Sequence, residues 1–92
     1  MRYVVLPSFE KTLRELGESD RHRIKYAMQS LKIFYETGQR PTGLGLKKLT
    51  SQMWEIRAGL RLRVIFTLEE DVLTWGIVGD HEQIRRHLKS RR

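Results

Sequence analysis

The feature that most constrains this fold is a strict alternation between residues 52 and 68. Every even-numbered position from Trp54 to Leu68 is apolar, whereas the odd-numbered positions carry most of the charge. A period of two is the spacing of a β-strand, whose side chains point alternately to the two faces of a sheet. Gly59 supplies a tight turn in the middle of this pattern. The alternation predicts a hairpin of strands 52–58 and 60–68 with one face in a core.

The flanking residues predict the rest of one domain spanning residues 1–92. Strands are expected at residues 2–6 and 72–78, and Ser8 is expected to cap a helix that Gly17 stops. A second apolar stripe predicts a helix from Ser19–Asp20 to Gly38, followed by a glycine-rich loop to residue 46. Asp80 can cap a closing helix.

This order of elements, β-α-α-β-β-β-α, predicts an α+β fold. We expect a small, mainly antiparallel sheet with two helices packed on one face. Large apolar residues usually lie inside a protein, so Trp54 is expected in the core. Strand 72–78 is apolar on both sides, so the pattern does not decide which face of the sheet Trp75 lies on.

The amino-acid composition narrows the classes of function that this chain can have. The 92 residues include 18 Lys and Arg against 11 Asp and Glu, for a formal net charge of +7. A small basic chain attracts nucleic acid or an acidic protein partner, although a basic surface can also serve solubility alone. Cysteine is absent, which excludes disulfides, thiolate metal sites and cysteine nucleophiles and fits the cytoplasm. No apolar run approaches the ~20 residues that cross a bilayer.

The alternation also gathers charge on the face of the sheet that points away from the core. Arg57, Arg61 and Arg63 are expected there together, with Glu55 relieving part of their repulsion. A partly charged, solvated face of an antiparallel sheet is the ordinary alternative. Met53 and Ile65 share this face, so cover from a loop, the last helix or a partner chain is expected. Further cations that can surround the face are Lys47, Lys48, Arg85, Arg86 and Lys89.

The histidines give a weaker signal. His22 is expected on the surface, and His81 follows the last strand, where side chains point toward a sheet edge. His81 and His87 are six residues apart, which is not a face-sharing helical spacing, so no metal site is expected. No Ser-His-Asp arrangement is singled out by spacing.

Two segments resemble the RelE/ParE toxin superfamily of bacterial toxin–antitoxin systems. Residues 54–66 are similar to that family's aromatic-x-Ile-Arg strand, glycine turn and Tyr-Arg-Val-Ile-Tyr strand, and residues 78–84 resemble its closing Val-Gly-x-His/Arg segment. Length, basic charge and order of elements agree, so the likeness covers nearly the whole chain.

The resemblance implies a metal-independent endoribonuclease that cuts mRNA, usually on the ribosome, and is neutralised by an acidic antitoxin. By position, Arg63 matches the arginine that contacts the scissile phosphate, and Arg57 matches a basic residue of the preceding strand. His81 matches a proton donor or phosphate ligand, and His87 falls where some members place an acid–base tyrosine. We expect these four residues to be catalytic. The residues expected to bind substrate are Lys47, Lys48, Glu55, Arg61 and Arg85. No cofactor or metal is implied.

Two departures from the family pattern keep other readings open. Glu55 stands where some members carry lysine, so it is either a general base or a hindrance to phosphate binding. No tyrosine follows Tyr35. The alternatives are a ParE-like inhibitor of DNA gyrase without nuclease activity, and a non-catalytic nucleic-acid-binding member, because one fold supports all three functions.

Overall fold

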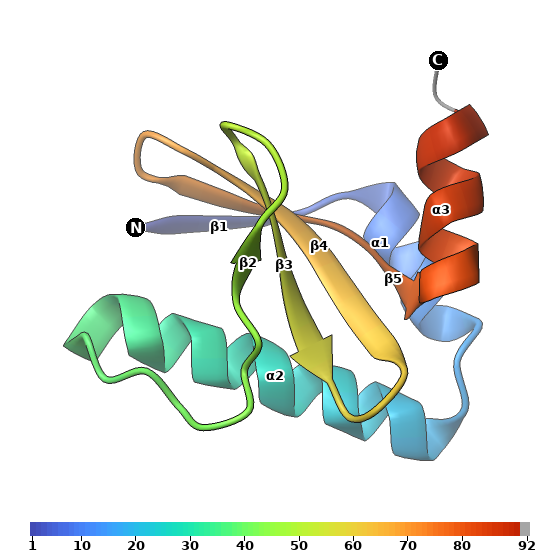
Figure 1. Ribbon diagram of the computed structural model, residues 1–92, viewed down its shortest axis with the longest axis horizontal. Coiled ribbons are helices and arrows are strands. Elements are labelled where there is room, and N and C mark those ends of the chain that lie inside the picture. Colours follow the sequence, from blue (N-terminus) through green and yellow to red (C-terminus); the bar gives the residue numbers. More distant parts are fainter. Residues whose placement is uncertain (91–92) are drawn as a thin grey trace.

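The computed structural model describes residues 1–90 and shows an open sheet with helices on both sides (Figure 1). The predicted α+β class and the order of elements are confirmed, with one short strand, β2, added at the end of the predicted loop. No helix among the described residues is long and apolar enough to cross a bilayer. In chain order the elements are β1 (Arg2–Val5), α1 (Pro7–Arg14), α2 (Glu18–Thr37), β2 (Lys47–Lys48), β3 (Met53–Ala58), β4 (Leu62–Glu69), β5 (Val72–Asp80) and α3 (His81–Ser90).

The sheet has five strands in the order β1-β5-β4-β3-β2. Strand β1 runs parallel to β5, and the other neighbours are antiparallel. In the predicted hairpin, Ile56 lies opposite Val64 and Arg57 lies opposite Arg63. The turn between these strands is longer than predicted, so Leu60 is fully exposed at its tip and not part of a strand. Gly59 enters this turn with a φ of 80°, which explains why glycine stands there.

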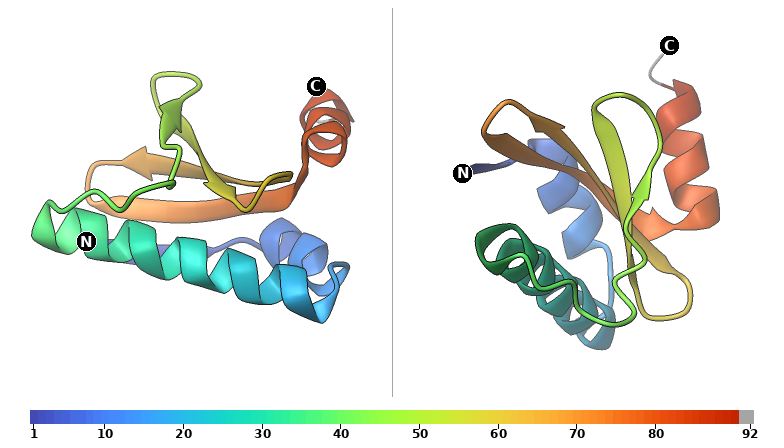
Figure 2. Two further views of the ribbon diagram at one scale, coloured as in Figure 1. Left: turned by 60° about the horizontal axis from the view of Figure 1, so that its bottom comes forward. Right: turned by 60° about the vertical axis from the view of Figure 1, so that its left-hand side comes forward.

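The main core lies between the sheet and the helices α1 and α2, which cover one face (Figure 2). The even-numbered residues Ile56, Ala58, Leu62, Val64 and Phe66 are all buried there, as the alternation predicts. Trp54 is only half-buried against this core, whereas Trp75 is fully buried and contacts the rings of Phe9 and Phe66.

A second, smaller core covers part of the opposite face. The register between β4 and β5 shifts after Ile65, which pairs with Ile77, while Phe66 pairs with Trp75. Gly76 is therefore the extra residue of a β-bulge, which turns Ile77 away from the main core. Ile84 of α3 covers Ile65 and Ile77, with Met53 packed beside them. The last helix thus supplies the cover that Met53 and Ile65 required.

Helix α1 completes the edge of the sheet where β1 ends. The expectation that Ser8 caps this helix is wrong, because the helix begins at Pro7 after Leu6 and has no side-chain cap. Ser8 instead donates a hydrogen bond from Oγ to the carbonyl of Gly76 at 2.8 Å, and the amide of Val78 donates to Oγ1 of Thr12 at 3.2 Å. Two hydroxyls thereby satisfy backbone groups of β5 that no neighbouring strand can reach.

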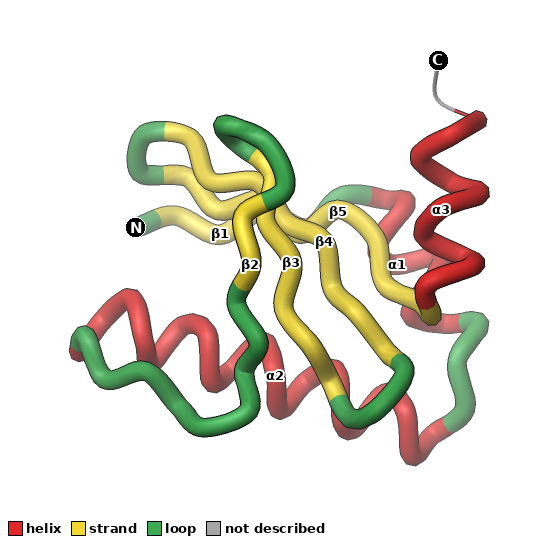
Figure 3. The backbone as a smooth tube through the Cα atoms, in the orientation of Figure 1, coloured by secondary structure: helices red, strands yellow, loops and turns green. Residues whose placement is uncertain are grey.

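Helix α2 ends as predicted at Gly38, whose left-handed φ of 79° closes its last turn. The following loop runs back along α2 before the chain enters β2 (Figure 3). The amide of Arg57 donates to the carbonyl of Leu44 at 2.9 Å, so this loop borders the edge of β3 beyond the two residues of β2.

Candidate functional site

A cavity of about 290 Å³ lies on the sheet face opposite α1 and α2. Strands β3 and β4 form its floor, α3 forms one wall, and β2 with the residue after it forms the other. We call it the α3 cavity. Its lining residues are Lys47, Leu49, Glu55, Arg63, Ile65, His81, Ile84, Arg85 and Leu88. Five of the nine site residues expected from the sequence therefore share one cavity.

Arg63 is the central cation of the α3 cavity. It lies in β4 directly opposite Gly79 of β5, where a Cβ would meet the side chain of Gln83. One terminal nitrogen of its guanidinium bonds a carboxylate oxygen of Glu55 at 3.0 Å. The side chain of Arg63 is 26% exposed, so this pair is partly shielded from water. A charge-assisted bond in such a setting fixes the orientation of the guanidinium.

The Glu55 carboxylate accepts a hydrogen bond from only one of the donors of the Arg63 guanidinium. Arginine carries five N–H donors, and the buried Nε of Arg63 has no hydrogen-bond partner among residues 1–90. A phosphate oxygen is the kind of acceptor that such a fork binds. The cavity thus holds an oriented cation with spare donors.

His81 is the first residue of α3, and a reciprocal pair of hydrogen bonds determines its place. The amide of Gln83 donates to the Asp80 carboxylate, and the amide of Asp80 donates to the Gln83 side-chain oxygen, both at 2.8 Å. This is a capping box, with Asp80 in the capping role predicted for it. The box holds the backbone on both sides of His81, whose side chain lines the α3 cavity.

Two more cations line the same cavity. Lys47 lies in β2 opposite Glu55, and Arg85 lies one turn of α3 beyond His81. Arg85 pairs with Glu82 at 3.4 Å, but both side chains are more than 60% exposed, so water weakens this bond. Three cations and an imidazole therefore surround one carboxylate, and the cavity favours an anionic ligand.

The other four expected site residues lie elsewhere. The guanidinium of Arg61 bonds Asp20 at 2.8 Å, and the ammonium of Lys48 lies 5.5 Å from the ring centre of Trp54. Arg57 is opposite Arg63 in the register, but its side chain runs over Gly45 and lines a separate groove beside α2. The sheet therefore does not present Arg57, Arg61 and Arg63 as one cluster, because the side chains diverge to different neighbours.

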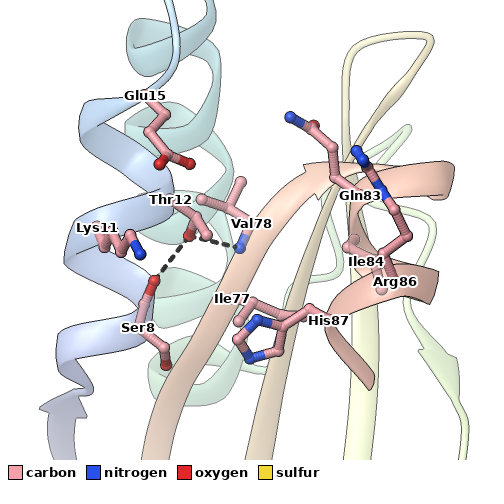
Figure 4. Close-up of a pocket in the computed structure, with 10 residues that line it drawn as sticks. All are labelled: Ser8, Lys11, Thr12, Glu15, Ile77, Val78, Gln83, Ile84, Arg86 and His87. Atoms are coloured by element: carbon pink, nitrogen blue, oxygen red, sulfur yellow. Dashed lines mark hydrogen bonds between the residues drawn. The ribbon is translucent and has the colours of Figure 1, made fainter. Parts of the chain in front are cut away.

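His87 lies in a further cavity of about 460 Å³ between α3 and α1 (Figure 4). Its ring points toward α1, where Ser8, Lys11 and Thr12 line the same cavity. His81 and His87 thus belong to two cavities on different sides of α3, as their spacing of six residues requires. The structure does not bring His87 to Arg63.

The sequence analysis missed the apolar walls of the α3 cavity. Leu88 follows Ile84 by four residues, so the helical period could have placed both on one face of α3. Leu49 carries no such signal, because it follows β2 in an irregular turn. Within residues 1–90, no group of three or more His, Asp or Glu side chains gathers to hold a metal ion.

Comparisons with known proteins find matches among solved structures but none among protein-family models or curated sequences. Among solved structures, YafQ from E. coli strain BL21(DE3) has a TM-score of 0.75 at 18% identity, covering 91% of this chain and 98% of YafQ. The E. coli DinJ–YafQ complex gives a TM-score of 0.76 at 18% identity, covering 91% of this chain and 98% of that chain.

The RelB–RelE antitoxin–toxin complex from Methanococcus jannaschii also matches, with a TM-score of 0.69 at 19% identity, covering 91% of this chain and 96% of that chain. The molecule is thus an α+β protein whose open mixed sheet carries a cationic cavity beneath its last helix. More narrowly, its fold is that of the RelE-like toxins, as the resemblance in the hairpin and closing segment implied. Identities below 20% establish this fold and leave the activity to be argued from the site.

Proposed function

We propose that this protein is the toxin of a type II toxin–antitoxin system and acts as a metal-independent mRNA endoribonuclease, associated with the ribosome. The observation that carries the proposal is the α3 cavity, which joins Arg63, His81, Lys47 and Arg85 in one place. The fold adds support, because solved structures that share it include antitoxin–toxin complexes. An acidic antitoxin is the partner that the net charge of +7 favours.

The proposed chemistry uses the 2′-hydroxyl of the RNA as the nucleophile. Its oxygen attacks the adjacent phosphorus, a base takes its proton, and the bond to the 5′-oxygen of the next nucleotide breaks. Arg63 binds the phosphate oxygens and stabilises the charge that builds up in the transition state. His81 donates a proton to the departing 5′-oxygen, since imidazole exchanges protons readily near neutral pH. Fixed cations supply the charge stabilisation that a metal ion supplies elsewhere.

The test combines induced expression, mapping of mRNA ends and two variants. We expect cleavage by the wild-type protein, and a loss of at least about 100-fold in both Arg63→Ala and His81→Ala, the scale of a lost general acid or phosphate contact. Arg14→Ala removes an exposed arginine at the end of α1 and is the matched control. Circular dichroism must show that all variants fold.

Each other result has a definite meaning. A folded, fully active His81→Ala protein contradicts the role given to the imidazole. Intact mRNA with accumulating DNA breaks indicates a gyrase inhibitor. Tight, salt-dependent RNA binding without cleavage indicates a non-catalytic member. The endoribonuclease proposal is overturned by DNA breaks with intact mRNA, and equally by RNA binding without cleavage.

A further inference from the structure

Another cationic surface lies beside α2 and shares no lining residue with the α3 cavity. One part is a cavity of about 420 Å³ between α2, the loop at residues 41–44 and the end of β3. The other is a cavity of about 370 Å³ around the β3–β4 turn. Arg23, Ala58 and Gly59 line both, so the two form one continuous surface, which we call the α2 groove. Figure 2 shows the loop running alongside the helix.

The groove exposes apolar side chains that the fold does not use. Tyr26 is 76% exposed and lines the cavity beside the loop, and Leu60 is fully exposed and lines the cavity around the β3–β4 turn. The lining also includes the buried small or apolar side chains of Ala27, Leu44 and Ala58. Large exposed side chains next to a groove are typical of interaction sites, and tyrosine is enriched among the residues that dominate binding energy.

The charges of the groove are predominantly positive and are held in place. Asp20 accepts hydrogen bonds from Arg23 at 2.9 Å and from Arg61 at 2.8 Å, one on each carboxylate oxygen. One carboxylate therefore orients two guanidinium groups without neutralising both. Arg57 adds a third arginine. Because Asp20 already orients Arg23 and Arg61, these two side chains lose less conformational entropy when a partner docks.

We propose that the α2 groove is the docking site of an acidic peptide segment that carries bulky apolar side chains. Carboxylates of the segment pair with Arg23, Arg57 and Arg61, while an apolar side chain packs between Tyr26 and Leu60. An RNA strand could stack a base on Tyr26, but the exposed Leu60 and the aliphatic walls offer no hydrogen bonds to base edges and suit apolar side chains better. If the proposed function holds, the segment belongs to the antitoxin, which then grips the toxin outside the α3 cavity.

The test uses nuclear magnetic resonance on the ¹⁵N-labelled protein and a defined probe. The probe is a 16-residue peptide of four Glu-Glu-Leu-Ser repeats, with control peptides in which Ser replaces Leu or Lys replaces Glu. We expect the acidic peptide to shift the amide signals of Tyr26, Gly59 and Leu60, and both control peptides to shift them far less. A decamer of uridine nucleotides is the RNA arm and is expected to leave these signals in place.

Variants then separate the groove from ordinary surface. Tyr26→Ser and Leu60→Ser are each expected to weaken peptide binding about fivefold or more, because they remove exposed apolar anchors without opening the core. Ile33→Ser is the matched control, an exposed apolar residue of the same helix that does not line the groove. All three variants keep whatever RNA cleavage the wild-type protein shows.

Three results overturn the inference: no peptide-induced shifts in the groove, an equal effect of Ile33→Ser, or displacement of the peptide from the groove by the uridine decamer. A chain that binds the peptide but cleaves no RNA contradicts only the proposed function. A chain that cleaves RNA but shows no peptide shifts contradicts only the docking site.

Discussion

At the scale of single residues, the pair of Glu55 and Arg63 decides the character of the α3 cavity. Glu55 is 9% exposed and bonds a terminal nitrogen of Arg63 at 3.0 Å. A buried carboxylate is stable only when it is paired, and Arg63 provides that pairing. The same carboxylate accepts a hydrogen bond from an N–H group that a phosphate would otherwise use. Glu55 therefore orients Arg63, and its negative charge also opposes the binding of an anionic ligand.

We therefore predict that Glu55→Gln strengthens binding of a nucleic-acid probe. The amide oxygen still accepts a hydrogen bond from Arg63, whereas the opposing negative charge is gone. A unit charge about 6 Å away at an effective dielectric constant of 20 contributes roughly 1–3 kcal/mol, so we expect about a tenfold lower dissociation constant. Fluorescence anisotropy with a 2′-deoxy oligonucleotide measures binding without cleavage.

Glu10→Gln, an exposed acidic residue of α1, makes the same change in net charge and serves as the control. Weaker binding by Glu55→Gln would show instead that the full charge is needed to hold Arg63. If binding tightens while RNA cleavage is lost, Glu55 is the general base of the reaction.

At the scale of elements, α3 determines whether the site exists. This helix buries Ile84 against Ile65 and Ile77 and begins at the capping box of Asp80 and Gln83. The cap therefore controls both the stability of the first turn and the position of His81, which begins that turn.

We predict that Asp80→Ala lowers the free energy of unfolding by about 1 kcal/mol, the usual effect of losing a side-chain cap. It should also reduce RNA cleavage, because His81 is then less firmly placed. Asp80→Asn keeps an oxygen that can accept the bond from the Gln83 amide and should restore most of both properties. Urea unfolding and a cleavage assay measure the two effects. If the Asn variant is as impaired as the Ala variant, the charge of Asp80 matters and not its cap.

At the scale of the whole molecule, stability depends on how β1 and α2 pack at the far end of the sheet. Burial raises the pKa of Tyr3, with a smaller contribution from the charge of Glu36. Burial also raises the pKa of Tyr35, and interaction with Tyr3 adds to it. The hydroxyl of Tyr3 is buried and has no hydrogen-bond partner in the described part of the chain. The fold thus favours the neutral form of both side chains.

This arrangement predicts a loss of stability in alkali. Below about pH 10, the usual pKa of tyrosine, both groups are neutral whether the chain is folded or not, and their contribution is fully present. As the pH rises further, the unfolded chain releases these protons first, so the free energy of unfolding falls. Tyr3→Phe and Tyr35→Phe should each weaken this dependence, and Tyr3→Phe should not lower stability at pH 7 because it removes an unpaired hydroxyl.

Urea midpoints measured between pH 8 and 11.5 test the prediction, with Tyr26→Phe as the control at an exposed position. The comparison between the variants and the wild-type protein carries the conclusion. Identical pH profiles for the wild-type, Tyr3→Phe and Tyr35→Phe proteins would contradict it.

The sequence by itself determined the elements and the faces of the hairpin. Side-chain direction in a strand repeats every two residues, so the alternation specified that Ile56, Ala58, Leu62, Val64 and Phe66 enter the main core, but it did not show that the turn leaves Leu60 exposed. Ser8 and Asp80 show the limit of such reasoning. Both are ordinary capping residues, yet only Asp80 caps a helix. Helix α1 begins at Pro7, before Ser8, and the Ser8 hydroxyl bonds the carbonyl of Gly76 in β5 instead.

Only the tertiary structure decided which charges meet. Arg57 and Arg63 face each other across two strands, but Arg57 runs over Gly45 and lines the α2 groove. Arg63 instead pairs with Glu55 in the α3 cavity. His81 lines the same cavity as Arg63 because α3 packs on a second core, and the bulge at Gly76 turns Ile77 into that core. Such contacts join residues far apart in the chain, and local periodicity carries no information about them.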